Sequence, residues 1–167
     1  MKYLITIIFI TLLKTSGMAL EIKTEITINA SPQEVWDILI DFNKYSDWNP
    51  FIKSIKGNPQ IDEKLTVTIE PPKETEMIFK PKILTILINK ELCWLGHFLV
   101  PGLLDGKHKF EIINNANGTT TFIQSEIFKG ILVPLFKNKL DNNTKNGFIA
   151  MNKKLKELAE NSIQQGV

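Results

Sequence analysis

The sequence has little of what several common kinds of functional site require. It contains one cysteine, Cys93, which excludes an internal disulfide, and it has no Cys/His cluster at metal-ligand spacing. The net charge is only +2, and no run of lysine or arginine is interleaved with aromatic residues. Proteins that bind nucleic acid normally carry such a basic surface. We therefore expect no metal, no cofactor and no nucleic-acid partner.

The composition is that of an ordinary globular protein. Hydrophobic residues make up 43% of the 167 residues and charged residues make up 23%, and both values are typical of a packed domain. A chain of this length can bury a sizeable core within one domain. We expect a single domain over residues 20–167 that acts as a monomer.

Residues 1–19 have the pattern of a secretory signal peptide. A short positive start precedes an apolar run of eleven residues over 3–13, and small residues at 17–19 suit the cleavage site. The run is too short to span a bilayer, so the mature chain is expected to have no integral membrane span. The pattern predicts export to the periplasm or the medium. The alternative is a cytoplasmic protein whose true start is Met18.

A strand and an interrupted helix follow the leader. Over residues 20–28, isoleucines share one face and charged residues occupy the other, which is typical of a half-buried strand. Ser31 and Glu34 then have the spacing of a capping box, and Pro32 occupies the first helical position. Turn-forming residues from Asn43 onward break this helix almost at once. We therefore expect two short helices after the first strand.

Strand-like segments separated by turn signals occupy most of the remaining chain. Near the C-terminus the apolar period changes to three, four or seven, which predicts one long amphipathic helix over residues 133–161. Consecutive strands joined by short turns form antiparallel sheets. The expected fold is α+β: a curved seven-stranded antiparallel sheet wrapped around the long C-terminal helix, with the two short helices closing its open end. The six strands expected after the short helices cover residues 52–56, 65–70, 76–87, 91–100, 107–114 and 119–128.

Two motifs carry a resemblance to a known superfamily. Residues 28–36 are INASPQEVW, and residues 45–50 are YSDWNP. With the order of elements, they resemble the START/Bet v 1-like superfamily and, within it, the bacterial polyketide cyclase/dehydrase-like (SRPBCC) proteins. The resemblance covers residues 21–160 and implies a helix-grip fold with an apolar cavity between sheet and helix. The superfamily includes lipid carriers, hormone receptors and cyclases, so the resemblance implies a fold more than a function.

The last hairpin decides which polar residues face the cavity. Strand alternation turns His108 and Phe110 inward. If residues 116–118 form a three-residue loop with a left-handed glycine, His108 faces Glu126 across the hairpin. A two-residue Asn-Gly turn would shift the register by one residue and place the opposite face of the last strand inside. Charged residues at alternating positions in similar family segments favour the first register.

The inward faces favour binding over catalysis. They are mainly apolar, and no nucleophile–base–orienter set is visible. We expect the cavity to bind a hydrophobic or amphipathic small molecule, such as a lipid, an isoprenoid or a polyketide-like compound. The alternative is a cofactor-free enzyme of the cyclase or dehydrase kind, with His108 as base and Glu126 as its orienter. The candidate cavity residues are Trp36, Trp48, Trp94, Phe98, His108, Phe110, Phe122, Gln124, Glu126, Phe148 and Met151.

Two further expectations concern His108 and Gly147. If pairing with Glu126 outweighs desolvation, the pKa of His108 in the folded state lies above about 6.5. Gly147 lies on or beside the inward stripe of the long helix, where glycine is unfavourable by about 1 kcal/mol relative to alanine. The missing side chain leaves room for a ligand or for close packing on the sheet. We therefore expect leucine at this position to be harmful and alanine to be mild.

Overall fold

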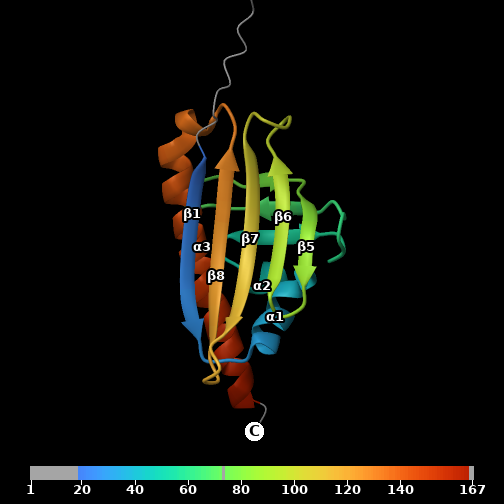
Figure 1. Cartoon of the computed structure of the whole chain (residues 1–167), viewed down its shortest axis with the longest axis vertical. Coiled ribbons are helices and arrows are strands. Elements are labelled where there is room, and N and C mark those ends of the chain that lie inside the picture. Colours follow the sequence, from blue (N-terminus) through green and yellow to red (C-terminus); the bar gives the residue numbers. More distant parts are fainter. Residues whose placement is uncertain (1–18, 73, 166–167) are drawn as a thin grey trace, which may run out of the picture.

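The computed structural model describes residues 19–72 and 74–165, so the predicted leader lies outside the described residues except for Ala19. The order of elements is a strand, two short α-helices with a 3₁₀ helix between them, seven further strands and one long helix (Figure 1). The elements are β1 (Leu20–Ile28), α1 (Pro32–Ile40), the 3₁₀ helix η1 (Phe42–Lys44), α2 (Tyr45–Trp48), β2 (Ile52–Lys56), β3 (Thr66–Ile69), β4 (Met77–Phe79), β5 (Lys82–Leu87), β6 (Glu91–His97), β7 (Asp105–Asn114), β8 (Thr120–Lys129) and α3 (Val133–Gln165).

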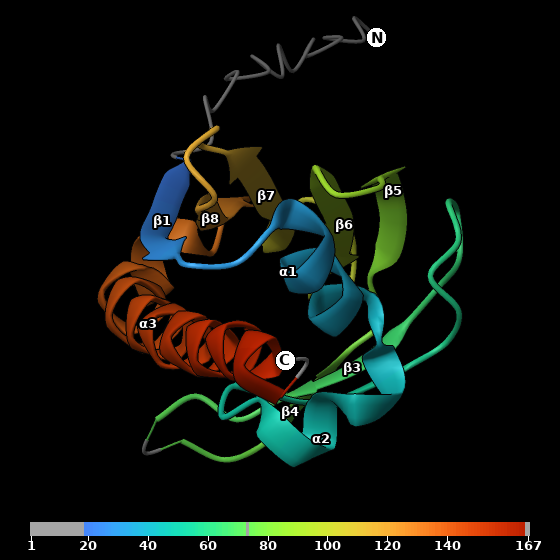
Figure 2. The ribbon, with the colours of Figure 1, turned by 90° about the horizontal axis from the view of Figure 1, so that it is seen from below.

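The strands form two antiparallel sheets around the long helix, which confirms the predicted helix-grip architecture. The larger sheet has the order β1-β8-β7-β6-β5, and the smaller has the order β2-β3-β4. Seen end on, α3 lies between the larger sheet and the layer formed by α2, β3 and β4 (Figure 2). None of the helices in the described part of the chain combines the length and the apolar character that a bilayer span requires.

The strand count differs from the expected seven because the segment over residues 76–87 is not one strand. It divides at Pro81 into β4 and β5, which belong to different sheets. Proline has no backbone N–H to donate and interrupts a ladder, while the Pro81 carbonyl accepts from the Leu65 amide at 2.8 Å. This corner folds the small sheet over the cavity side of α3. The segment over residues 91–100 is also shorter than expected, since β6 ends at His97.

The break after α1 delivers aromatic side chains to the core. The capping box is present: Ser31 Oγ accepts from the Glu34 amide at 3.3 Å, and Glu34 Oε2 accepts from the Ser31 amide at 2.7 Å. After the break, the Tyr45 hydroxyl donates back to the Leu39 carbonyl at 2.7 Å. Trp36 and the aromatic residues of α2 are buried in the main hydrophobic core. The two short pieces are therefore needed to turn a corner that one straight helix could not.

The β7–β8 hairpin has the predicted three-residue loop. The Asn115 amide donates to the Thr119 carbonyl at 3.0 Å, and Gly118 has the left-handed φ of +83° that the loop requires. In this register His108 lies opposite Glu126. The two-residue turn is wrong, because it would require the register to shift by one residue along the whole ladder.

Gly147 allows close packing of an aromatic ring on α3. A Cβ added at this glycine would overlap the ring of Phe51. That ring is almost fully buried and meets Phe148 edge to face, with centroids 5.8 Å apart. The expectation that alanine would be mild is therefore wrong for this geometry, since even one methyl group displaces the ring. The missing side chain makes room for Phe51, and Phe51 itself forms part of the cavity wall.

We expect Gly147→Ala to lower the free energy of unfolding by up to about 2 kcal/mol. Overpacking a core site costs about 1–3 kcal/mol, and the better helix propensity of alanine returns about 1 kcal/mol. Chemical denaturation measures the difference, with Asn146→Ala on the exposed side of α3 as the control. Adding Phe51→Leu to Gly147→Ala should recover part of the loss. A Gly147→Ala protein as stable as the Asn146→Ala control would show that the ring is not confined by the helix.

Candidate ligand-binding cavity

An internal cavity of about 480 Å³ lies between α3, the small sheet and the adjoining ends of β6, β7 and β8. Its wall is largely apolar and includes Val67, Phe79, Trp94, Phe128 and Leu140. Lining residues that are exposed, such as Phe98 and Phe136, mark its mouth, while buried ones mark its floor. The polar side chains of the lining are His108 and Glu126 on the sheet, and Lys139, Asn143 and Thr144 on α3.

Four of the predicted cavity residues line this space: Trp94, Phe98, His108 and Glu126. The other predicted residues do not line it and are buried elsewhere in the protein. Strand alternation identified the inward face correctly, but it could not show how far along that face the cavity extends. The predicted residues that are not among the lining are Trp36, Trp48, Phe110, Phe122, Gln124, Phe148 and Met151.

Most of the lining that the sequence analysis missed comes from the small sheet and the start of α3. Ile69 and Met77 reach the cavity because the chain folds over at Pro81, and no local pattern shows that fold. Phe136 and Leu140 could have been found, because they lie four residues apart on the apolar stripe of the helix.

His108 is enclosed by aromatic rings. Its ring centroid lies 5.3 Å from that of Trp94, 4.4 Å from that of Phe110 and 4.8 Å from that of Phe148. Burial in this apolar surrounding lowers the pKa of His108 to about 3. We expected this pKa to rise if pairing with Glu126 outweighed desolvation. Desolvation dominates, so the pKa falls and the expected rise is wrong. The imidazole is therefore neutral at physiological pH.

The Gln124 amide contacts the imidazole of His108. Its Nε2 lies 3.1 Å from His108 Nε2 and donates to Met151 Sδ at 3.4 Å. With the amide nitrogen as donor in this contact, His108 Nε2 accepts and the ring hydrogen lies on Nδ1. Nδ1 is the atom nearest Glu126, at 3.7 Å from Oε2.

Glu126 places a carboxyl group in the cavity wall. Its side chain is only 16% exposed, and its Oε1 lies so close to Gly106 that a Cβ there would overlap it. Burial raises the pKa of this carboxyl from 4.5 to about 8. The separation of 3.7 Å from His108 is longer than a hydrogen bond, so it does not offset the loss of hydration. At neutral pH the wall therefore presents a protonated carboxyl beside a neutral imidazole.

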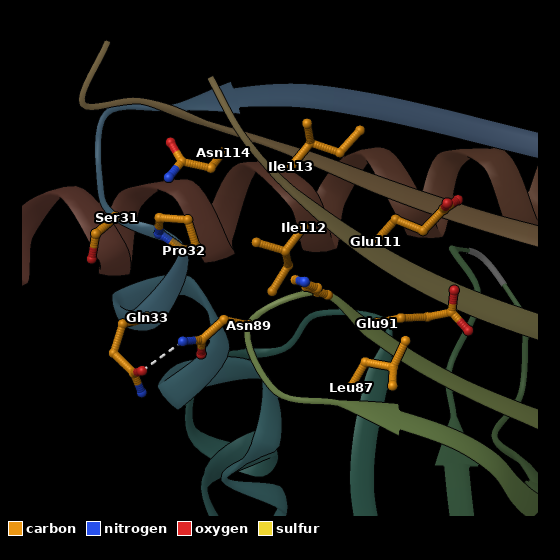
Figure 3. Close-up of a pocket in the computed structure, with 11 residues that line it drawn as sticks. Ser31, Pro32, Gln33, Leu87, Asn89, Glu91, Glu111, Ile112, Ile113 and Asn114 are labelled. Carbon is orange, nitrogen blue, oxygen red and sulfur yellow. Dashed lines mark hydrogen bonds between the residues drawn. The ribbon is translucent and has the colours of Figure 1, made fainter. Parts of the chain in front are cut away.

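A second, open groove of about 650 Å³ lies at the opposite end of the larger sheet (Figure 3). It is formed by the start of α1, the β5–β6 turn and the end of β7. Asn89 Nδ2 donates across it to Gln33 Oε1 at 2.7 Å. None of the predicted site residues lies in this groove. It is a surface depression around a turn, whereas the internal cavity encloses a largely apolar space.

We expect an infrared band from a protonated carboxylic acid at neutral pH, and we expect Glu126→Gln to abolish it. The band should disappear as pH rises through about 8. The same substitution should change the pH dependence of stability. Because the folded pKa lies above the unfolded one, the contribution of Glu126 is fully present below about 4.5 and is lost as pH rises toward about 8.

Denaturation between these pH values should therefore show a decline of a few kcal/mol in the wild type that Glu126→Gln removes, since a tenfold change in proton affinity is about 1.4 kcal/mol. Glu25→Gln, on the exposed face of β1, is the control and should keep the decline. A wild type without the infrared band would mean that Glu126 is ionised at neutral pH, which would contradict the raised pKa.

Solved structures with the same architecture are numerous and distant in sequence. The aromatase/cyclase Zhui from Streptomyces sp. R1128 superposes with a TM-score of 0.72 at 11% identity, covering 87% of this chain and 96% of its own. Norcoclaurine synthase from Thalictrum flavum, in complex with dopamine and hydroxybenzaldehyde, gives 0.67 at 12% identity, covering 95% and 96%. A protein of unknown function from Staphylococcus aureus gives 0.67 at 14% identity, covering 90% and 99%. These similarities establish the fold.

The sequence itself identifies the family. No curated protein matches the chain, but the family described as polyketide cyclase / dehydrase and lipid transport matches residues 19–160. This range runs from β1 to the last turns of α3 and so includes both sheets and every element that lines the cavity. The chain therefore belongs to the polyketide cyclase / dehydrase and lipid transport family, within the SRPBCC/Bet v 1-like superfamily.

Proposed function

We propose that the protein binds one hydrophobic or amphipathic small molecule, of lipid, isoprenoid or polyketide-like chemistry, in the internal cavity. The observation that carries this proposal is a largely apolar space of about 480 Å³ with a single buried carboxyl group in its wall. This volume lies within the range of about 300–1,000 Å³ that small-molecule sites occupy. The bound form is proposed to be a monomer.

The two parts of the wall would contribute differently to binding. The rings and aliphatic side chains supply the affinity, at about 25 cal/mol for each Å² of apolar surface that the ligand removes from water. The protonated Glu126 carboxyl supplies orientation, because it can donate a hydrogen bond to a carbonyl or hydroxyl oxygen. An apolar molecule with one oxygen-bearing end matches both features.

A cofactor-free cyclase or dehydrase is the second candidate. The pKa of Glu126, close to neutral, favours it, because general acids and bases work best near the operating pH. The roles would differ from those first expected: His108, with its pKa near 3, is a poor base, and Glu126 would transfer the proton. Binding remains the better-supported proposal. Among the described lining residues, the titratable side chains besides Glu126 are His108, which is a poor base, and Lys139, which is exposed and paired with Glu74. Export, which we also propose, would separate such an enzyme from cytosolic carrier-bound intermediates.

Titration with the neutral apolar fluorophore N-phenylnaphthylamine tests the binding proposal. The wild type should enhance its fluorescence and transfer energy from Trp94 in the cavity wall. Leu140→Trp places a large ring in the cavity and should weaken binding by about tenfold or more, which corresponds to about 1.4 kcal/mol. Ile149→Trp adds a similar ring on the exposed side of α3 and should bind like the wild type.

Equal binding by the Leu140→Trp and Ile149→Trp proteins would place the fluorophore outside the cavity. A wild type that binds no apolar fluorophore under any solution condition would contradict an open, ligand-accessible cavity. Circular dichroism spectra that match the wild type are required of both variants, because a misfolded protein also loses binding.

A further inference from the structure

Two uncharged apolar loops lie at the same end of the protein, uppermost in Figure 1. The first joins β6 to β7 and has the sequence FLVPGLL over residues 98–104. The second, GILVPLF over residues 130–136, leads into α3 and includes its first turn. Their tips are unusually exposed for aliphatic side chains: Leu99 is 79% exposed, Leu135 is 75% and Ile131 is 65%. We call Phe98, Leu99, Val100, Ile131, Leu135 and Phe136 the mouth patch.

Backbone contacts join the two loops into one surface. The Ile131 amide donates to the Gly102 carbonyl at 3.1 Å, and the Leu132 amide donates to the Leu103 carbonyl at 3.0 Å. Gly130 passes so close to the Leu103 carbonyl that any side chain would overlap it. The exposed side chains of the mouth patch are therefore held at fixed positions beside one another.

The mouth patch is continuous with the cavity. Phe98 and Phe136 belong to both, since each lines the cavity and is also exposed to solvent, at 44% and 37%. A body that covered the mouth patch would therefore also contact the cavity at Phe98 and Phe136. An apolar molecule could then pass between that body and the cavity without crossing water.

Two exposed lysines lie beside the mouth patch. Lys129 and Lys137 directly flank the second loop and are exposed, and neither forms an ion pair within the described part of the chain. The acidic residue that follows the first loop, Asp105, is already bound: it accepts from the Gly102 amide at 3.0 Å and contacts His97 Nδ1 at 2.7 Å. The loops therefore present apolar tips with unpaired positive charge beside them.

We propose that the mouth patch docks on an anionic lipid bilayer, with the loop tips in the interfacial region and Lys129 and Lys137 at the phosphate groups. Apolar side chains beside lysines are the combination that binds membrane surfaces. The residues that dominate binding at protein–protein interfaces are more often tryptophan, tyrosine and arginine. The exposed residues here are mainly aliphatic and lie at the end of the molecule. Docking requires no ligand in the cavity, so this proposal can hold or fail independently of the proposed function.

Vesicle flotation tests the docking surface. Protein purified from its host as the full chain is mixed with vesicles of equal parts phosphatidylglycerol and phosphatidylethanolamine. Leu99→Glu combined with Leu135→Glu should lower the vesicle partition coefficient by about tenfold or more. Leu87→Glu combined with Ile88→Glu is the matched control, because it makes the same charge change on exposed residues at the opposite end of the sheet. The control should float like the wild type, apart from the general effect of net charge that both share.

Insertion is measured directly with a tryptophan at the loop tip. Leu99→Trp should be quenched by brominated lipids in the vesicles, whereas Ile88→Trp should not. This comparison decides the question even if a retained leader anchors every variant and masks the difference in flotation. Raising the salt concentration should weaken binding, since lysine–phosphate attraction is screened within about 10 Å at 0.1 M salt.

The proposal would be overturned if the two tryptophans were quenched equally. It would also be overturned if the loop variant floated like its matched control and no difference in quenching was seen. Absence of wild-type binding to anionic vesicles would do the same. Sedimentation that shows a dimer abolished by the loop variant, without vesicle binding, would assign the mouth patch to a second copy of the chain. In each case N-phenylnaphthylamine binding without vesicles reports on the cavity separately.

Discussion

The register of β7 against β8 is the constraint on which the cavity depends. A three-residue loop with a left-handed Gly118 joins these strands, and it fixes His108 opposite Glu126. Side chains alternate between the two faces of a sheet, so a shift of one residue would turn Glu126 to solvent and bring Ile127 inward. The chemistry of the cavity thus follows from a turn at the far end of the hairpin.

Desolvation then sets the protonation of the two residues that the register brings together. His108 lies among three aromatic rings and loses its charge, and Glu126 lies against Gly106 and keeps its proton. A protonated acid beside a neutral imidazole carries no net charge, and this suits an apolar cavity better than an ion pair that needs hydration. The family description covers both cyclases and lipid transport. A single buried hydrogen-bond donor in an apolar wall can orient a molecule, whereas an acid–base reaction needs one group to donate a proton and another to accept it.

Features that depend on local physics could be predicted from the sequence. The capping box of Ser31 and Glu34, the break after α1, the long α3 and the Gly118 loop were all predicted and are confirmed. Each depends on residues only a few positions apart, whose backbone preferences or hydrogen bonds are decided locally. The inward positions of His108 and Glu126 follow from the same local rules.

Features that depend on distant residues could not be predicted. The corner at Pro81 folds the small sheet over α3. The cavity therefore lies beside β3 and β4 and not beside Trp36 and Trp48, where it was predicted. The low pKa of His108 depends on Phe148, forty residues along the chain. The tight fit of Phe51 against Gly147 likewise joins positions that no periodicity connects. Sequence patterns predicted which face of each strand and helix is buried. The position of the cavity and the protonation of its residues depend on how these elements pack together.

Native mass spectrometry of the protein purified from its own host tests the central claim most directly. We expect a bound molecule that is mainly apolar with one oxygen-bearing end, released on denaturation and absent from the Leu140→Trp protein. Wild-type protein that carries no such molecule, or a mass retained equally by the Leu140→Trp protein, would contradict a ligand in the internal cavity.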